Sequence, residues 1–319
     1  MPLPADLARL GISVEANLPA LPFRPALLRD RVRETANRFL PGRGTPIGLP
    51  QALGRFGSLE VRLAVSSREV KRAQRLRYKV FYGEMSAVPM GLAALKRRDI
   101  DDYDEVCDHL LVLDHAVAPK PFRAHKPKVV GTYRLLRQEV AVAHAGFYTA
   151  GEFDIAPLLA RHRGKNLLEL GRSCVLKPYR NKKTVELLWA GIWAYVQRHG
   201  VDAMIGCASL EGTDPDRLAV PLSFLHHYAR AEADWRATAL PGRYIRMDRI
   251  AADALNRKAA LLSLPPLVKA YLRVGAKFGD GAVIDRQFGT TDVFVVMPVK
   301  AISGRYLHYF GPAANRFAA

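Results

Sequence analysis

The sequence predicts an α/β (α+β) fold in which helices flank a mixed central β-sheet. Strand-like apolar segments alternate with amphipathic helical segments along residues 58–229. Their order, β-α-β-β-β-α-β-α, is typical of a sheet covered by helices. The chain has 319 residues, of which 49% are hydrophobic and 24% are charged, an ordinary globular composition that is sufficient for a large core.

The first strand and helix follow from residue spacing. A half-buried strand is predicted over Ser58–Val65, because apolar and polar residues alternate there. Ser67 is predicted to cap the next helix, since a serine hydroxyl accepts hydrogen bonds from the first turn. One side of this helix is apolar and comprises Val70, Ala73, Leu76, Val80 and Phe81.

The later elements of the main domain follow from the same patterns. Strands are predicted at Asp108–Leu113, Lys128–Leu136, Leu167–Leu176 and Ala203–Ala208. Thr184–His199 is predicted to be an amphipathic helix that Gly200 ends. Its inner face comprises Val185, Leu188, Trp189, Ile192, Trp193 and Val196. A further helix is predicted over Pro215–Ala229, and a break at Pro221 is left open.

Two regions flank the main domain, which is predicted to cover residues 58–250. Residues 1–57 form an arm rich in Pro, Gly and Arg, with a short helix predicted over Pro25–Phe39. Residues 251–319 form a C-terminal extension, with a helix over Leu267–Ala276 and a strand over Asp292–Pro298. The apolar residues Val268, Leu272 and Ala276 lie near Lys269, Arg273 and Lys277, so the extension is expected either to pack on the core or to contact an anionic membrane.

Charge and cysteine content limit the classes of partner and compartment. The formal net charge of +18 indicates a polyanionic partner, which is a nucleic acid, an anionic membrane or an acidic protein. The chain shows no helix-turn-helix, zinc-finger or RNP motif, so a nucleic-acid-binding protein is only the non-enzyme alternative.

Three widely spaced cysteines indicate no disulfide framework, and no signal peptide or membrane-spanning segment is predicted. We therefore expect a cytoplasmic protein, with peripheral contact to the inner face of the membrane as a further hypothesis.

A cluster of aspartates follows the first helix. Asp99, Asp101, Asp102 and Asp104 lie within six positions. Such a cluster is either a solvated turn or a set of carboxylates that binds a cationic amine. Close carboxylates raise one another's pKa, so one of them is also a candidate base.

Charged residues also interrupt two apolar strands. Arg134 needs an ionic partner in its strand, and either Glu169 or an aspartate could supply it. Glu169 and Arg172 are three positions apart, which puts them on opposite faces of a regular strand unless a bulge at Gly171 changes their direction. These residues form either a structural salt-bridge network or part of a catalytic site.

A basic loop precedes the helix at Thr184. Arg180, Lys182 and Lys183 lie where the backbone N–H groups of a helix N-terminus and positive charge could bind a phosphate. The loop is therefore a candidate site for the phosphodiester of a pantetheine arm.

Together these motifs resemble two related families of GNAT-like N-acyltransferases. Arg77, Phe81, the aspartates, Arg134 and Glu169-x-x-Arg172 are similar to the signature of acyl-homoserine-lactone synthases, but the tryptophan expected after Phe81 is absent. The ornithine-lipid acyltransferase family is a closer resemblance. The segments that resemble it are Ala73–Met85, Asp104–Leu110, Glu169–Val175, Pro265–Gly275, Gly279–Asp285 and Thr290–Phe294. The last three matter most, because the lactone synthases lack them.

This resemblance implies a reaction and a set of roles. The expected reaction transfers a 3-hydroxyacyl chain from the 4′-phosphopantetheine of acyl carrier protein to the α-amine of L-ornithine, giving lyso-ornithine lipid. The alternatives are another amine acceptor and a coenzyme A donor. The expected catalytic residues are Glu169, Asp101 and Arg172. The expected substrate-binding residues are Arg77, Phe81, Asp99, Asp102, Asp104 and Arg134. The expected acyl-donor-binding residues are Ser173, Cys174, Val175, Arg180, Lys182, Lys183 and Thr184.

No bound cofactor or metal is expected. The pair His226–His227 and the more distant His308 lack a third ligand at helical spacing. The expected partners are acyl carrier protein, ornithine and an anionic membrane surface, with no nucleic acid.

Overall fold

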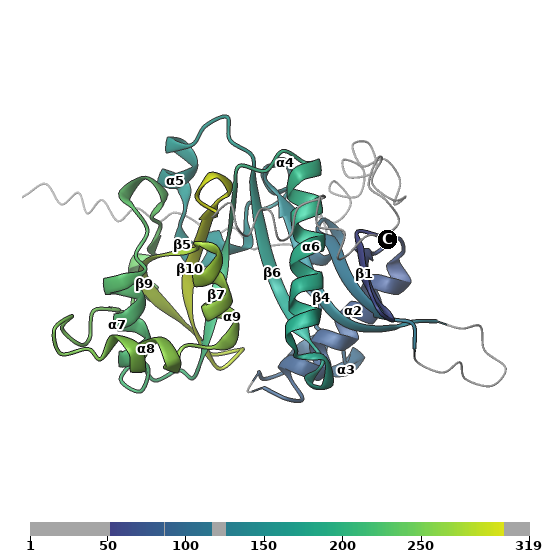
Figure 1. Cartoon of the computed structure of the whole chain (residues 1–319), viewed down its shortest axis with the longest axis horizontal. Helices are drawn as coiled ribbons and strands as arrows, with labels where there is room; N and C mark the ends of the chain where they lie inside the picture. Colours follow the sequence, from purple (N-terminus) through teal and green to yellow (C-terminus); the bar gives the residue numbers. More distant parts are fainter. Residues whose placement is uncertain (1–51, 86, 117–125, 303–319) are drawn as a thin grey trace, which may run out of the picture. The chain divides into compact units, whose positions relative to one another are not determined.

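A computed structural model of the chain describes residues 52–85, 87–116 and 126–302 (Figure 1). All of them belong to one compact unit, residues 43–319. The helix predicted over Pro25–Phe39 and the residue His308 lie outside the described ranges. The domain boundaries after residues 57 and 250 stay predictions.

The described residues form a ten-stranded mixed sheet. Across the sheet, the strands follow the order β1 (Gly54–Phe56), β2 (Leu59–Leu63), β3 (Asp108–Asp114), β4 (Lys128–Arg137), β6 (Leu167–Val175), β7 (Ala203–Glu211), β10 (Thr290–Pro298), β9 (Lys277–Asp285), β8 (Thr238–Ala239) and β5 (Phe153–Asp154). Neighbours from β1 to β6 are antiparallel, β6 and β7 are parallel, and β7, β10 and β9 are antiparallel again.

Helices cover this sheet. They are α2 (Ser67–Phe81), α3 (Gly91–Lys96), α4 (Gln138–Ala143), α5 (Ala156–Arg161), α6 (Lys182–Arg198), α7 (Ala219–Tyr228), α8 (Arg257–Ser263) and α9 (Pro266–Val274). Two short 3₁₀ turns matter for the site, η1 (Asp102–Glu105) and η2 (Tyr148–Gly151). Within the described ranges, no helix combines the length and the apolar character that crossing a bilayer requires.

The helices α6 and α2 lie on opposite faces of the β3–β4 region. Successive side chains of β3 point to opposite faces. Leu110 meets Gly191 of α6, where an added Cβ would lie 3.1 Å from a Leu110 methyl group. The next residue back, His109, reaches the Asp104 carbonyl at 3.1 Å, on the face where α2 binds the same aspartate. Figure 1 shows α6 crossing one face of these strands.

The order of the larger predicted elements is confirmed, with shifts at their ends. The cap of α2 was predicted wrongly: Ser66 accepts the hydrogen bond from Glu69 N, and Ser67 is the first helical residue. Asn181 caps α6, so this helix begins at Lys182, two residues before the predicted start. Pro221 does not split α7, because it lies in the first turn, where a missing N–H is tolerated.

The segment after residue 250 continues the central sheet. β10 pairs with β7 in an unbroken antiparallel register from Thr290↔Glu211 to Pro298↔Ala203. β9, which the sequence patterns did not predict, pairs with the other side of β10. In α9, Val268 is 1% exposed, and Ala276, just after the helix, is also 1% exposed; this favours core packing for that part of the extension.

The sheet forks between β6 and β7. The two strands pair only where Leu167–Glu169 faces Ala203–Ile205, and beyond that point their register ends. Gly206 lies at the fork, since an added Cβ there would come within 2.5 Å of the Leu170 carbonyl oxygen. The two strands therefore pack backbone to backbone at this position and separate beyond it.

Candidate active site

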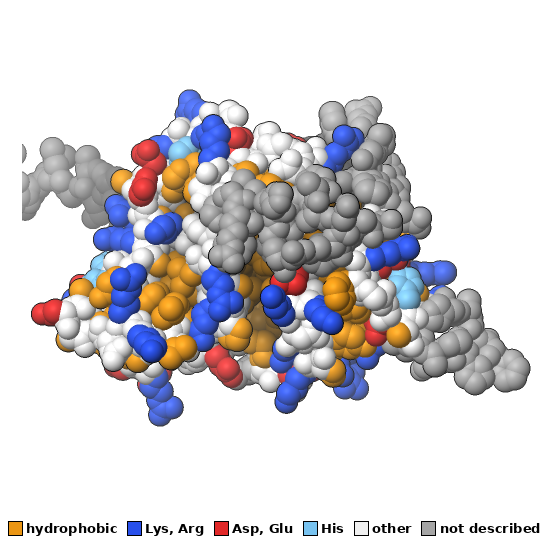
Figure 2. All heavy atoms as spheres, viewed as in Figure 1, with side chains coloured by type: hydrophobic (Ala, Val, Ile, Leu, Met, Phe, Trp, Pro, Cys, Tyr) orange, Lys and Arg blue, Asp and Glu red, His pale blue; other side chains and the backbone are white. Residues whose placement is uncertain are grey.

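The fork opens into a large cavity of about 1070 Å³. One wall comes from Leu170–Val175 of β6, and the other comes from Cys207–Ser209 of β7. α2 contributes Phe81, and α9 contributes several apolar side chains. Figure 2 shows hydrophobic side chains at the floor of the hollow between α9 and α6, with Lys and Arg at its rim. The cavity is mainly apolar, as a pocket for an acyl chain must be.

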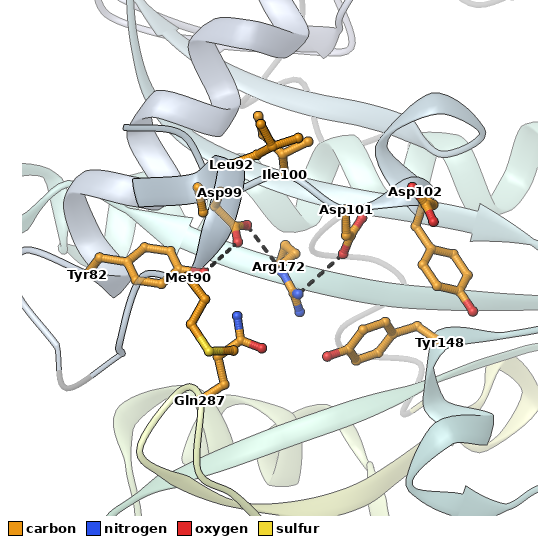
Figure 3. Close-up of a pocket in the computed structure, with 12 residues that line it drawn as sticks. Tyr82, Met90, Leu92, Asp99, Ile100, Asp101, Asp102, Tyr148, Arg172 and Gln287 are labelled. Atoms are coloured by element: carbon orange, nitrogen blue, oxygen red, sulfur yellow. Dashed lines mark hydrogen bonds and ion pairs between the residues drawn. The ribbon is translucent and has the colours of Figure 1, made fainter. Parts of the chain in front are cut away.

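A smaller cavity of about 360 Å³ lies next to it. Asp99, Asp101 and Asp102 line this cavity (Figure 3). Tyr148 and Arg172 line both cavities. The two cavities therefore meet at Arg172.

A β-bulge in β6 directs Arg172 toward the cavities. On β4, Tyr133 alone separates Thr132 from Arg134, whereas two residues of β6 occupy the facing stretch between Gly171 and Cys174. Arg172 has a φ of 49°, which is unusual for a residue with a side chain. The bulge that the sequence analysis considered is present, one residue after Gly171, and it brings Glu169 and Arg172 to the same cavity.

Aromatic rings and carboxylates hold the Arg172 guanidinium. It lies 4.9 Å from the Tyr148 ring centroid and 4.8 Å from that of Phe288. Its Nε lies 3.3 Å from Asp99 Oδ2, and its Nη2 lies 3.3 Å from Asp101 Oδ2 (Figure 3). Stacking and ion pairing together fix the plane of the guanidinium.

The Arg77 guanidinium is fully buried and holds the acidic loop against α2. Its Nε donates to Asp99 Oδ2 at 2.7 Å, and its Nη2 donates to Asp104 Oδ2 at 2.7 Å. Gln74 donates to the same Asp104 oxygen at 3.0 Å. A buried charge is stable only when it is paired and hydrogen-bonded, so these contacts fix the loop.

Arg134 completes what we call the arginine–aspartate network, formed by Arg77, Arg134, Arg172, Asp99, Asp101 and Asp104. Arg134 Nη1 pairs with Asp101 Oδ1 and lies 3.5 Å from Asp104 Oδ1. Of the two partners considered for Arg134, the aspartates are the ones it meets. Three guanidinium groups balance three carboxylates, which leaves no excess negative charge in the network for an added amine.

The fourth aspartate of the cluster, Asp102, is exposed at the start of η1 and has no ion pair among the described residues. Figure 3 shows its side chain turned away from Arg172. Asp102 therefore borders the smaller cavity without joining the network.

Glu169 is buried and holds the η2 turn in place. Its Oε1 accepts from Thr149 N at 2.7 Å and from the Thr149 hydroxyl, and its Oε2 accepts from Tyr148 N at 2.8 Å. Burial raises the pKa of Glu169, and these hydrogen bonds oppose the shift only in part. Glu169 is thus a carboxylate in the large cavity, and it also positions Tyr148 beside Arg172.

The predicted donor-binding residues divide into two groups. Ser173, Cys174, Val175, Arg180 and Lys182 line the large cavity. Lys183 and Thr184 do not: the Lys183 ammonium lies over the Phe56 ring at 4.7 Å, and the Thr184 N–H is capped by Asn181. Burial raises the pKa of the Cys174 thiol, so this residue is not a reactive thiolate.

A polar group interrupts the apolar wall of the large cavity. The hydroxyls of Tyr133 and Tyr271 lie 2.9 Å apart, and Ser173 hydrogen-bonds to Tyr133. All three residues line the cavity. Three hydroxyls that make two mutual contacts retain one O–H that can donate to another group.

A second acidic cluster lies on the β7 side. Glu152, Asp285 and Asp292 have carboxylate oxygens within 4.8 Å of one another. Elsewhere among the described residues, His226, His227 and Asp248 also gather. Asp248 is the third group that sequence spacing did not supply, and His227 Nε2 lies 3.2 Å from it and 2.9 Å from the Ile250 carbonyl.

Sequence reasoning missed several residues of the site. Tyr82 donates to Asp99, Tyr148 and Phe288 enclose Arg172, and Tyr271 meets Tyr133. Their common signal is a tyrosine or phenylalanine in a loop or a half-polar helix, which is too frequent to indicate a site alone.

Comparison with known proteins places the chain in a family. Residues 76–190 match the acetyltransferase (GNAT) domain model. The chain is 55% identical to the L-ornithine N(alpha)-acyltransferase of Agrobacterium fabrum, over 82% of this chain and 88% of that protein. It is 54% identical to the enzyme of that name from Brucella abortus, over 83% of this chain and 93% of that protein. The chain belongs to the L-ornithine N(alpha)-acyltransferase family.

The chain is also similar to the solved structure of FeeM, an N-acyl amino acid synthase from uncultured soil microbes. The TM-score is 0.44, and the sequence identity is 11% over 76% of this chain and 91% of that one.

Membership in the L-ornithine N(alpha)-acyltransferase family confirms two predictions from the sequence. The protein is an acyltransferase, and its mixed sheet with flanking helices is a GNAT-like fold. The family that the tail segments Gly279–Asp285 and Thr290–Phe294 resembled is the family to which the chain belongs.

Removal of Arg77 should destabilise the fold. Arg77→Leu leaves Asp99 and Asp104 as buried carboxylates that have lost a partner, so we expect the free energy of unfolding to fall by about 3–5 kcal/mol. Urea denaturation measures it. The matched control is Arg55→Leu, because Arg55 forms an exposed pair with Glu60 at 3.4 Å and should contribute no more than about 1 kcal/mol. Equal losses in the two variants would contradict a structural role for the network.

Proposed function

We propose that this protein transfers a 3-hydroxyacyl chain from acyl carrier protein to the α-amine of L-ornithine and forms lyso-ornithine lipid. The observation that supports L-ornithine as the acceptor is sequence identity: the chain is 55% and 54% identical to two relatives named L-ornithine N(alpha)-acyltransferase. In the reaction, the amine nitrogen forms a bond to the thioester carbonyl carbon, the carbon–sulfur bond breaks, and the pantetheine leaves as a thiol. The proton lost from the amine ends on that sulfur.

Glu169 is the better candidate for the base. Burial raises its pKa, so it accepts a proton from an ammonium more readily than an ordinary carboxylate does. Burial also acts on Asp101, but the charges of Arg134 and Arg172 outweigh it and lower the pKa of that carboxyl. In this mechanism Asp101 holds Arg172, and Glu169 takes the proton directly or through water. The backbone N–H groups at Ser173–Val175 are the candidates that stabilise the oxyanion.

The fork cavity suits a carrier-bound thioester. Its apolar volume accepts an acyl chain, and Arg180, Asn181 and Lys182 line its edge at the start of α6. The positive end of the helix dipole and the charges of Arg180 and Lys182 favour binding of the phosphate of the pantetheine arm. The net charge of +18 would speed encounter with an acidic carrier protein.

The hydroxyl group of the donor chain also has a candidate partner. In the otherwise apolar wall, Tyr133, Tyr271 and Ser173 retain a free O–H donor. A 3-hydroxyl group near the thioester would accept a hydrogen bond from this free O–H. An unsubstituted acyl chain would leave the O–H without a partner.

An exposed apolar segment supports contact with a membrane. Val88, Met90, Leu92 and Leu95 are 56%, 60%, 54% and 80% exposed, and Lys96, Arg97 and Arg98 follow them. We call these seven residues the α3 patch. Apolar side chains beside cations are the elements of a peripheral contact with anionic lipid. Met90 and Leu92 also line the smaller cavity. Membrane contact through the α3 patch would therefore lie next to the proposed active site, where the amphiphilic product forms.

A substrate panel tests the proposed reaction. Purified protein is incubated with 3-hydroxyacyl carrier protein, the unsubstituted acyl carrier protein, or coenzyme A thioesters, each with L-ornithine, and the amide is identified by mass spectrometry. We expect the 3-hydroxyacyl carrier protein to be the best donor. Replacing all three hydroxyls (Tyr133→Phe, Tyr271→Phe and Ser173→Ala) removes the spare O–H and should reduce the preference for the hydroxylated chain roughly 5- to 10-fold, because one hydrogen bond contributes about 1 kcal/mol. A preference for coenzyme A, or no amide with ornithine, would refute the donor or the acceptor respectively.

The role of Glu169 is tested by turnover and by pH. Glu169→Gln should lower turnover about 100-fold or more and should remove the acid limb of the pH profile of kcat/KM, since that limb reports protonation of the base. Thr149→Val removes one hydrogen bond to Glu169 and should move the acid limb without abolishing it. Reduced turnover with an unchanged acid limb in Glu169→Gln would show that Glu169 only positions the η2 turn.

The α3 patch is tested by flotation with anionic vesicles at low salt. Leu95→Glu should reduce the bound fraction about 10-fold, because it removes an apolar side chain from the contact and adds a repelled charge. Val142→Glu is the matched control, since Val142 is 76% exposed on α4, outside the patch. No binding by the unaltered protein, or equal effects of the two substitutions, would exclude the patch.

A further inference from the structure

The second acidic cluster comes from three separate parts of the chain. Glu152 lies just after η2, Asp285 ends β9, and Asp292 lies in β10. Glu152 and Asp292 are 5% and 6% exposed. Asp285 and Asp292 line the large cavity, together with Cys207 and Ser209. The proposed mechanism has given none of these carboxylates a role.

The cluster has fewer cationic partners than carboxylates. Among the described residues, its one ion pair is with Arg243, whose Nη2 lies 3.3 Å from Glu152 Oε1. The arginine–aspartate network differs, because there each carboxylate meets at least one guanidinium. Three carboxylates with one cationic partner form a site with excess negative charge, and buried negative charge requires a partner.

Glu152 also has an unsatisfied atom. Its Oε2 is inaccessible to solvent and has no hydrogen-bond partner among the described residues. Burial and the neighbouring charge of Asp292 raise the pKa of Glu152 to about 7. A buried acceptor without a donor is costly, and a bound cation would supply that donor.

The cluster lies close to the groups proposed for the chemistry. Thr149 donates its hydroxyl to Glu169, and Cys207 Sγ lies 3.7 Å from the same Thr149 oxygen. Cys207 also lies beside Glu152. On the other side, Asp285 Oδ1 accepts from Phe288 N at 3.0 Å, and the Phe288 ring stacks on Arg172. Glu169, Arg172, Asp285 and Asp292 line the same large cavity, so one small molecule there can contact both the groups proposed for the chemistry and two carboxylates of the cluster.

We propose that Glu152, Asp285 and Asp292 bind the side-chain ammonium of the acceptor and make the enzyme selective for diamino acids. This inference rests on the proposed function. The α-amine then lies at Glu169, the α-carboxylate faces Arg172, and the terminal ammonium lies among the three carboxylates. An ammonium donates three hydrogen bonds, one for each carboxylate. Because the oxygens lie within 4.8 Å of one another, a nitrogen can be placed within about 2.8 Å of each of them, the usual length of a charge-assisted bond.

Two of the three carboxylates come from the C-terminal segments that resemble the ornithine-lipid acyltransferase family. Asp285 and Asp292 belong to Gly279–Asp285 and Thr290–Phe294, the segments that distinguished the two resembling families in the sequence. In the site, these segments supply two of the three carboxylates. The aspartates at Asp99, Asp101 and Asp104 are not available for this task, because their charge is balanced by arginines.

The test compares two acceptors that differ by the terminal amine. L-Ornithine and L-norvaline share a carbon skeleton, and only ornithine carries the side-chain ammonium. With a fixed acyl donor, Asp292→Asn should lower kcat/KM for ornithine roughly 10- to 100-fold, the effect of losing one charged hydrogen bond. The kcat/KM for norvaline should stay within about twofold of the unaltered protein. Asp285→Asn should act in the same way, and its amide oxygen can still accept from Gln287 N and Phe288 N.

The controls separate folding, function and this inference. Asp253→Asn removes an exposed carboxylate outside the site and should not change the ratio of ornithine to norvaline. Melting temperature and norvaline acylation report whether each variant folds. If norvaline turnover is too slow to measure, the shift of melting temperature by ornithine replaces it, and this shift should be lost in Asp292→Asn and in Asp285→Asn.

Three outcomes would overturn the inference. They are an unchanged ornithine-to-norvaline ratio in both cluster variants, equal use of the two acceptors by the unaltered protein, and tight binding of Mn²⁺ alone at these carboxylates with loss of activity in chelator. Failure of the unaltered protein to acylate ornithine from any donor would instead refute the proposed function.

Discussion

The ion pairs of Arg172 are the contacts on which the arrangement of the site depends. Arg172 reaches Asp99 and Asp101 only because a bulge turns its side chain out of the regular alternation of β6. Through these aspartates it connects to Arg77 in α2 and Arg134 in β4. Helix, loop and two strands thus meet at one charge-balanced centre, and both cavities open on it.

The two acidic clusters differ in what they leave for a ligand. Around Arg77, the carboxylates meet guanidinium groups of the chain itself, so the cluster stabilises structure and holds Arg172. Around Glu152, only one of the three carboxylates pairs with a guanidinium among the described residues, so the cluster has more carboxylates than cationic partners. An acid-rich sequence segment therefore does not identify the amine site, because the charges brought to it by folding decide whether it can bind.

Local patterns in the sequence predicted the strands and helices whose apolar residues repeat regularly, such as β4 and α6. They also predicted that Arg134 needs a partner, and they left open whether a bulge at Gly171 changes the direction of Arg172. They did not predict β9, because Gly279 and Gly281 interrupt its pattern, or the convergence of Glu152 with Asp285 and Asp292. That convergence depends on the pairing of β10 between β7 and β9, and no spacing within a single segment carries such information.

The position of β10 has a consequence for synthesis of the protein. β10 is among the last described strands to leave the ribosome, yet it occupies the middle of the sheet, between β7 and β9. Until it arrives, the edge of β7 has no neighbour on that side, and an unpaired strand edge is a template for association with other chains. Nascent or truncated chains should therefore depend on chaperones, and the part of the cavity wall that contains Thr290 and Asp292 forms only when translation has passed this strand.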